Sequence, residues 1–135
     1  MCDINKKTDL TTKIIYKVVR ILDGKYYAYY SGLPIEIGKV DSSWEDKKHK
    51  WPDYLHYKFT RLYNNNMIGK TSGFATLKAA MILKQNCKYY QDTTTILKIK
   101  LGGEIWKGNG KNISSVISND IVTYAGTEIL SFEEI

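Results

Sequence analysis

The sequence has few of the residues that would place it in a disulfide, metal or membrane class. Its two cysteines, Cys2 and Cys87, are too few for a disulfide framework, and no group of Cys and His has the spacing of zinc ligands. No apolar run approaches the length of a membrane span, and the first residues lack the apolar core of a signal peptide. We therefore expect a reduced, metal-free, intracellular (cytoplasmic) protein that does not enter a membrane.

Arginine is also scarce. Among the 20 basic residues only Arg20 and Arg61 are arginines, although the net charge is +6. Because arginine is the better residue for bidentate recognition of phosphates and base edges, a charge carried by lysine argues against a sequence-specific reader of nucleic acid. The abundance of Lys, Ile, Asn and Tyr is typical of an AT-rich genome, which fits phages, large DNA viruses and AT-rich bacteria as the source.

At 135 residues the chain fits a single domain with one core. We expect residues 1–12 to be a flexible tail and residues 13–135 to form one α+β domain. The patterns predict a mainly antiparallel, twisted sheet of five to seven strands with one principal helix packed on it. Strands are expected at Lys13–Leu22, Lys25–Ser31, Ile35–Val40, Tyr54–Tyr63 and Ile96–Leu101, and Ile113–Tyr124 with Thr127–Phe132 is expected to supply one or two more short strands.

Local signals mark the connections between these strands. Asp23-Gly24 predicts a tight hairpin turn, and Gly108–Lys111 predicts another turn. In Ile96–Leu101 apolar residues alternate with lysines, which predicts a strand with one buried face. The glycine pair Gly102-Gly103 that follows it predicts a bulge or a sharp bend.

The stretch Gly69–Gln85 reads as a loop that turns into a helix. Thr76 precedes apolar residues at helical spacing, so it is the expected N-cap of a helix that ends near Asn86. The glycines of the loop would let backbone amides approach an anion near the helix start. Lys70, Thr71 and Ser72 are therefore candidate ligand-binding residues.

The letters GKT at Gly69–Thr71 do not make a phosphate-binding P-loop. That motif requires a glycine where Asn64 stands, and its helix follows directly, whereas Ser72-Gly73 intervene here.

Two tryptophans, Trp44 and Trp51, lie in the hydrophilic stretch DSSWEDKKHKWPD. They fit two interpretations. Each can fold back as a lid on the core, or the pair can form a surface on which a base or a partner stacks.

The arrangement resembles small ADP-ribosyltransferase-like domains, including those of the rifampin-modifying type. The resemblance rests on a first strand that carries a basic residue, on GFATLKAA at Gly73–Ala80, and on a lysine-flanked strand that ends in Gly-Gly-Glu. It also extends to uncharacterised phage and large-virus proteins that share the YKVVR start. The S-T-S triplet of the transferase family is absent.

The resemblance implies a role for five residues, with NAD as the ligand or cofactor. Arg20 would hold the ADP-ribose part, Thr71 and Ser72 would contact the nicotinamide ribose, and Phe74 would supply an aromatic face. Glu104 would be the catalytic carboxylate that favours an oxocarbenium-like centre. Each residue also has an ordinary structural role to fill, such as an ion pair for Arg20 or a solvated charge for Glu104.

Three functions follow from these observations. The first is a small basic binding domain for a nucleotide-derived ligand of the NAD or ADP-ribose type, or for a host protein. The second is an active ADP-ribosyltransferase-like enzyme. The third, less favoured, is a binder of single-stranded nucleic acid, because stretches such as KYYAYY interleave tyrosine with lysine.

Overall fold

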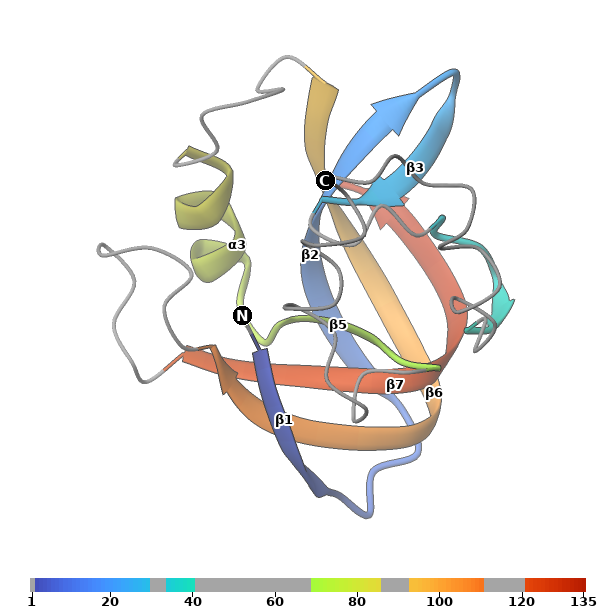
Figure 1. The fold of residues 1–135 in the computed structure, drawn as a ribbon, viewed down its shortest axis with the longest axis vertical. Helices are drawn as coiled ribbons and strands as arrows, with labels where there is room; N and C mark the ends of the chain where they lie inside the picture. Colours follow the sequence, from blue (N-terminus) through green and yellow to red (C-terminus); the bar gives the residue numbers. More distant parts are fainter. Residues whose placement is uncertain (1, 30–33, 41–68, 86–92, 111–120) are drawn as a thin grey trace, which may run out of the picture.

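A computed structural model gives the fold (Figure 1). It describes residues 2–29, 34–40, 69–85, 93–110 and 121–135. In these ranges the chain forms seven strands and one helix: β1 (Cys2–Lys7), β2 (Lys13–Leu22), β3 (Lys25–Ala28), β4 (Gly38–Lys39), β5 (Thr71–Phe74), α3 (Leu77–Gln85), β6 (Thr94–Gly110) and β7 (Ile121–Glu134). Every strand pairing is antiparallel, which agrees with the expected α+β class.

Four of the strands pair in a closed circuit. β2 pairs with β6, β6 with β7, β7 with β5, and β5 returns to β2 at the pair Tyr16 and Phe74. Where β5 and β2 diverge, Lys17 Nζ donates a hydrogen bond of 2.6 Å to the carbonyl oxygen of Ser72. The other strands lie on the outside of this circuit, β1 on β6, β3 on β2 and β4 on β7. Figure 1 shows β6 and β7 side by side as two long, curved ribbons.

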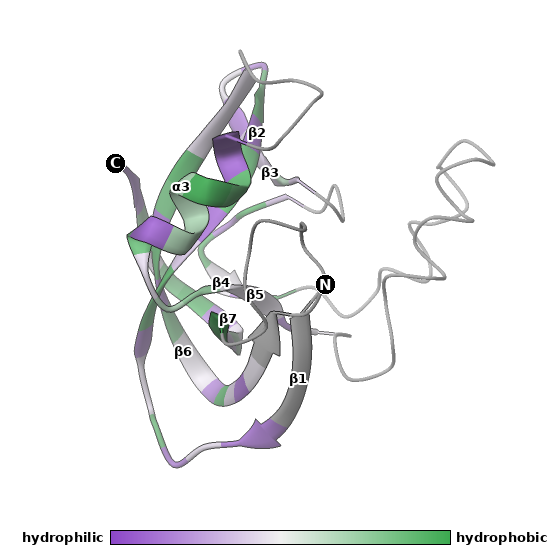
Figure 2. Ribbon diagram, turned by 90° about the vertical axis from the view of Figure 1, so that its left-hand side faces the viewer, coloured by the Kyte–Doolittle hydropathy of each residue, from purple (hydrophilic) through white to green (hydrophobic). Residues whose placement is uncertain are grey.

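The sheet has two apolar faces because apolar side chains of β2 and β6 point to both sides of it. We call inner the face that carries Ile15, Leu97 and Ile105, which are fully buried in the larger core cluster. We call outer the opposite face, where Val18 and Phe74 pack beneath α3 in a second cluster. In Figure 2 the helix lies along one side of the sheet. Successive side chains of these strands therefore contribute alternately to two hydrophobic cores, one on each face of the sheet.

The long strands β6 and β7 bend without ending. Register shifts occur between Lys100 and Leu101 and between Gly102 and Ile105, and Gly103 has a φ of 69°. The bulge predicted at Gly102-Gly103 is therefore confirmed, but it bends β6 instead of terminating it.

One turn prediction is wrong because of this continuity. The turn expected at Gly108–Lys111 is absent from Gly108–Gly110, because β6 runs on to Gly110. β7 is one continuous strand where one or two short strands were expected. Gly126 lies within β7, and an added Cβ there would lie 2.9 Å from Leu101 Cβ. A glycine is needed at position 126 because β7 and β6 lie too close together there for a side chain.

The N-terminal residues expected to form a flexible tail contain β1 instead. Cys2–Lys7 pairs with the second half of β6, from Gly110 to Trp106. The polar sequence CDINKK did not predict this strand, because an edge strand rich in lysine lacks the alternation of apolar residues that is typical of a buried strand.

The local predictions for the hairpin and the helix are confirmed. Asp23 and Gly24 have φ angles of 52° and 75°, as a two-residue hairpin turn with both φ angles positive requires. The helix begins after Thr76, whose Oγ1 accepts a hydrogen bond of 3.3 Å from the Ala79 amide. Among the described residues, no helix has the length and apolar character needed to cross a membrane.

Candidate functional site

The segment predicted to be a ligand loop is a buried strand. Thr71–Phe74 forms β5, all four of its residues are buried, and its register with β7 runs from Thr71 opposite Gly126 to Phe74 opposite Thr123. The prediction of a loop is wrong because the glycines serve close strand packing. An added Cβ at Gly73 would lie 2.8 Å from the Tyr16 carbonyl oxygen.

The structure separates several residues that the sequence grouped together. Phe74 lies in the core beneath α3, and Thr71 is buried with its side chain on the other face of β5 from Ser72. Arg20 is opposite Thr94 at the start of β6, ten residues along that strand from Glu104, a path of about 33 Å. Arg20 and Glu104 are thus not neighbours.

The two tryptophans of the sequence prediction, Trp44 and Trp51, lie outside the described residues, as does the strand expected at Tyr54–Tyr63.

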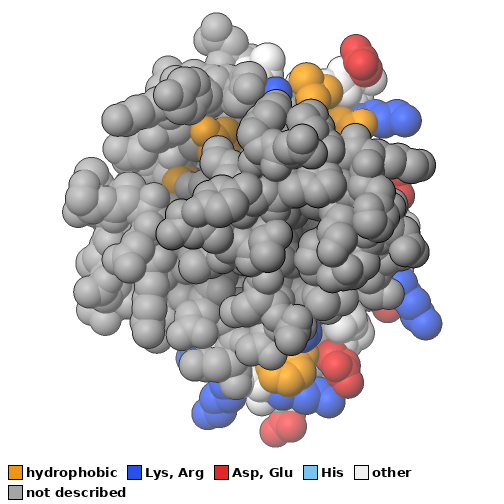
Figure 3. Space-filling view, in the orientation of Figure 1, with side chains coloured by type: hydrophobic (Ala, Val, Ile, Leu, Met, Phe, Trp, Pro, Cys, Tyr) orange, Lys and Arg blue, Asp and Glu red, His pale blue; other side chains and the backbone are white. Residues whose placement is uncertain are grey.

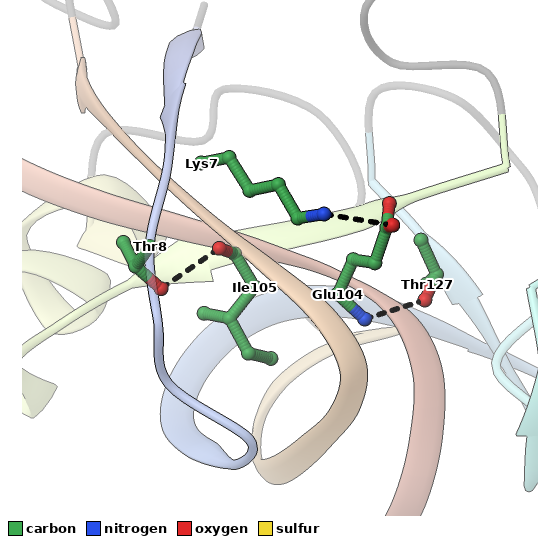
Figure 4. Close-up of polar contacts among 5 residues, drawn as sticks. All are labelled: Lys7, Thr8, Glu104, Ile105 and Thr127. Carbon is green, nitrogen blue, oxygen red and sulfur yellow. Dashed lines mark hydrogen bonds and ion pairs between the residues drawn. The ribbon is translucent and has the colours of Figure 1, made fainter.

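Glu104 and Lys7 form an ion pair between β6 and β1. Lys7 Nζ lies 3.0 Å from Glu104 Oε1, and both side chains are about half exposed. Figure 4 shows the two side chains pointing toward each other across the strands. The end of β1 is fixed beside them, because the amide and the hydroxyl of Thr8 both donate to the Ile105 carbonyl oxygen, at 2.9 Å and 2.8 Å.

The β6 bulge sets the position of Glu104. Gly103 supplies the positive φ, and the Glu104 amide donates a hydrogen bond of 3.0 Å to Thr127 Oγ1 on β7. A side chain at Gly103 would collide with that hydroxyl. The bulge therefore aims Glu104 outward while Ile105 remains buried in the inner core.

Lys70, the residue immediately before β5, reaches the same place. Its Nζ lies over the ring of Trp106, 4.5 Å from the centroid, and its charge acts on Glu104. Trp106 stands directly opposite Ala125 of β7 and Lys7 of β1. Strands β1 and β6 and the residue before β5 thus bring Lys7, Lys70, Glu104 and Trp106 together, and we call these four residues the outer-face cluster.

The electrostatics of the cluster favour an ionised Glu104. The hydrogen bond from Lys7 and the charge of Lys7 hold the pKa of the Glu104 carboxyl below its ordinary value, and Lys70 adds to the effect. The indole N–H of Trp106 comes close enough to Glu104 to act in the same direction, but it does not meet the carboxylate at hydrogen-bond geometry. Two cations and a carboxylate therefore coexist around one aromatic ring.

Replacing Lys7 with glutamine is expected to raise the pKa of Glu104 toward its ordinary value. The folded state favours the ionised form of Glu104, so the ion pair stabilises the protein at pH values above the pKa that Glu104 has in the unfolded chain. This stabilisation is lost as the pH falls through the pKa of Glu104 in the folded protein. The contribution is small because the pair is exposed. Carbon-13 NMR titration of the Glu104 carboxyl measures the shift. Lys25→Gln, at the hairpin, is the control and should leave the midpoint unchanged; equal shifts in both variants would contradict the assignment.

Two buried polar atoms beside the cluster have no hydrogen-bond partner in the described part of the chain. They are Trp106 Nε1 and Thr123 Oγ1. Thr123 stands opposite Gly108, two residues beyond Trp106 on the same face of β6. A buried donor without an acceptor costs about 1–3 kcal/mol, so this face carries unused hydrogen-bonding capacity.

The residues present in the described ranges do not form a metal site, since no three His, Cys, Asp or Glu side chains gather there. Comparison of the chain with protein-family models, curated proteins and solved structures finds no match.

Sequence reasoning named Lys70, Ser72 and Glu104 but missed Lys7, Trp106 and Thr127. A signal for Trp106 was present, because it follows Glu104 by two residues in a strand and so shares its face. Lys7 carried no such signal, since its strand was not expected.

Proposed function

We propose that this protein is a binding domain for a nucleotide-derived ligand of the ADP-ribose or NAD type, and that the outer-face cluster is its site. The observation that carries the proposal is the gathering of Trp106, Lys70, Lys7 and an ionised Glu104 from β6, from β1 and from the residue before β5. An aromatic ring, two ammonium groups and a carboxylate are the groups that recognise a base, phosphates and ribose hydroxyls.

Each group has a chemical role toward such a ligand. The indole of Trp106 offers a surface on which a base stacks, an interaction of about 1–3 kcal/mol per base. Lys7 and Lys70 supply charge-assisted hydrogen bonds to a pyrophosphate. An ionised Glu104 accepts hydrogen bonds from ribose hydroxyls, as acidic residues do in dinucleotide-binding domains.

Isothermal titration calorimetry with ADP-ribose and with NAD tests the proposal. Lys70→Gln and Glu104→Gln are each expected to weaken binding about tenfold, because each removes a charged hydrogen-bond partner. Trp106→Ala should weaken it by about tenfold or more through lost stacking. The matched controls are Lys100→Gln and Glu36→Gln, both at exposed positions, and neither should change the affinity.

Two results would overturn the proposal. One is the absence of binding of either ligand by the wild-type protein. The other is an equal loss of affinity in Lys70→Gln and Lys100→Gln, which would mean that net charge and not this site holds the ligand. The same samples separate a binder from a transferase, because consumption of NAD that disappears in Glu104→Gln would identify turnover.

A further inference from the structure

Three lysines and Tyr124 lie along a row on the inner face of the sheet. Lys13 Nζ lies over the Tyr124 ring, 4.6 Å from its centroid. Lys107 stands directly opposite Tyr124 in the pairing of β6 with β7. Lys6 stands directly opposite Lys107 in the pairing of β1 with β6. We call Lys6, Lys13 and Lys107 the inner-face lysine cluster.

The lysines of this cluster differ from other lysines of the sheet in the residues that lie opposite them on neighbouring strands. Lys7 pairs with Glu104, Lys98 stands opposite Glu133, and Lys39 stands opposite Glu128. Figure 3 shows lysine and acidic side chains close together at the edge of the visible face. Within the described strand pairings, Lys6 and Lys107 instead face each other, and like charges directly opposite are destabilising.

The charges of the cluster are available to a ligand. Lys6 and Lys107 are exposed, and Lys13 is half-buried. The contact with the Tyr124 ring positions the Lys13 ammonium but leaves its charge intact, unlike an ion pair. A row from β1 across β6 to β7 covers two strand spacings, about 10 Å, which is longer than one phosphate group.

We propose that the inner-face lysine cluster binds the phosphate backbone of single-stranded nucleic acid without regard to sequence. A row of point charges about 10 Å long requires successive phosphates, and lysine contacts phosphate as a point charge without reading bases. A single row of lysine charges can follow the phosphates of one nucleic-acid strand, whereas a duplex presents two phosphate backbones. This site lies on the opposite face of the sheet from the outer-face cluster and does not depend on it.

Fluorescence anisotropy with a labelled twelve-residue oligothymidine measures this binding. Three phosphate contacts predict a slope of about −2 in log affinity against log salt, so affinity should fall about twentyfold between about 50 and 200 mM salt. An unlabelled duplex and a polyglutamate peptide serve as competitors. Competition by either as strong as by the unlabelled single strand would overturn the proposal, as would a slope near zero.

Lys107→Glu separates binding from folding. The new carboxylate faces Lys6, so it removes the like-charge pair, and the melting temperature should stay equal or rise. Binding of the oligothymidine should nevertheless fall by more than about tenfold. Lys100→Glu makes the same charge change at an exposed position opposite Ser131 on the outer face and should have a much smaller effect. Equal losses in the two variants would refute a localised site.

Discussion

Replacing Gly73 with alanine is expected to destabilise the protein by about 3 kcal/mol, the upper end of the usual cost of overpacking, and to lower the melting temperature by about 10 °C. The added Cβ would lie 2.8 Å from the Tyr16 carbonyl oxygen and 2.8 Å from Ile15 Cδ1. A backbone carbonyl cannot swing aside. Because β5 meets β2 at this point, relief of the clash requires the strand circuit to open.

Gly102→Ala is the matched control for this prediction. Its Cβ would also meet atoms closer than 3.0 Å, but they are the branched end of Leu130, which is 39% exposed and can turn toward solvent. Both substitutions restrict the unfolded chain equally, so that effect cancels in the comparison. Thermal unfolding followed by circular dichroism should place Gly102→Ala within about 1 kcal/mol of the wild type. Equal costs would mean that the approach of β5 to β2 does not limit stability.

Replacing Ile99 with alanine is expected to lower the free energy of unfolding by about 2–5 kcal/mol. Ile99 is fully buried in the inner core and stands opposite Ile15 on one side and Phe132 on the other. Removing its methylene and methyl groups leaves a cavity whose walls belong to three paired strands. Strands held by their ladders cannot collapse fully into the space, so most of the packing is lost.

Urea denaturation measures this effect through the transition midpoint. Ile99→Val, which removes one methylene, should cost about 0.5–1.5 kcal/mol and remains measurable if the alanine variant fails to fold. Ile37→Ala deletes the same atoms at a position that is 69% exposed and should cost less than about 0.5 kcal/mol. A similar midpoint for Ile99→Ala and Ile37→Ala would show that the inner face is not the principal core.

The candidate site illustrates how far residue types alone can lead. Glu104 was named from a family resemblance and Lys70 from a presumed loop, yet they meet because β5, β7 and β6 lie in sequence across the sheet. Neither reason anticipated that arrangement. The pairing of Trp106 with Lys7 depends on the register of β1, and a register between segments about a hundred residues apart leaves no trace in either segment.

Short-range patterns were enough for the features that depend on neighbouring residues. The strand Lys13–Leu22, the turn at Asp23-Gly24, the helix cap at Thr76 and the bulge at Gly102-Gly103 are set by propensity, backbone freedom and hydrogen bonds within a few residues. These features depend only on residues close together in the sequence, so they can be predicted from the sequence alone.

Long-range pairing determined the rest of the fold and the composition of the candidate site. It made a strand of Thr71–Phe74, continued β6 and β7 through their glycines, and placed Lys7, Lys70 and Glu104 beside Trp106. The physical reason is that a β-ladder joins residues distant in sequence, and the free energy that selects one register comes from burial on both sheet faces at once. That burial exists only in the folded molecule.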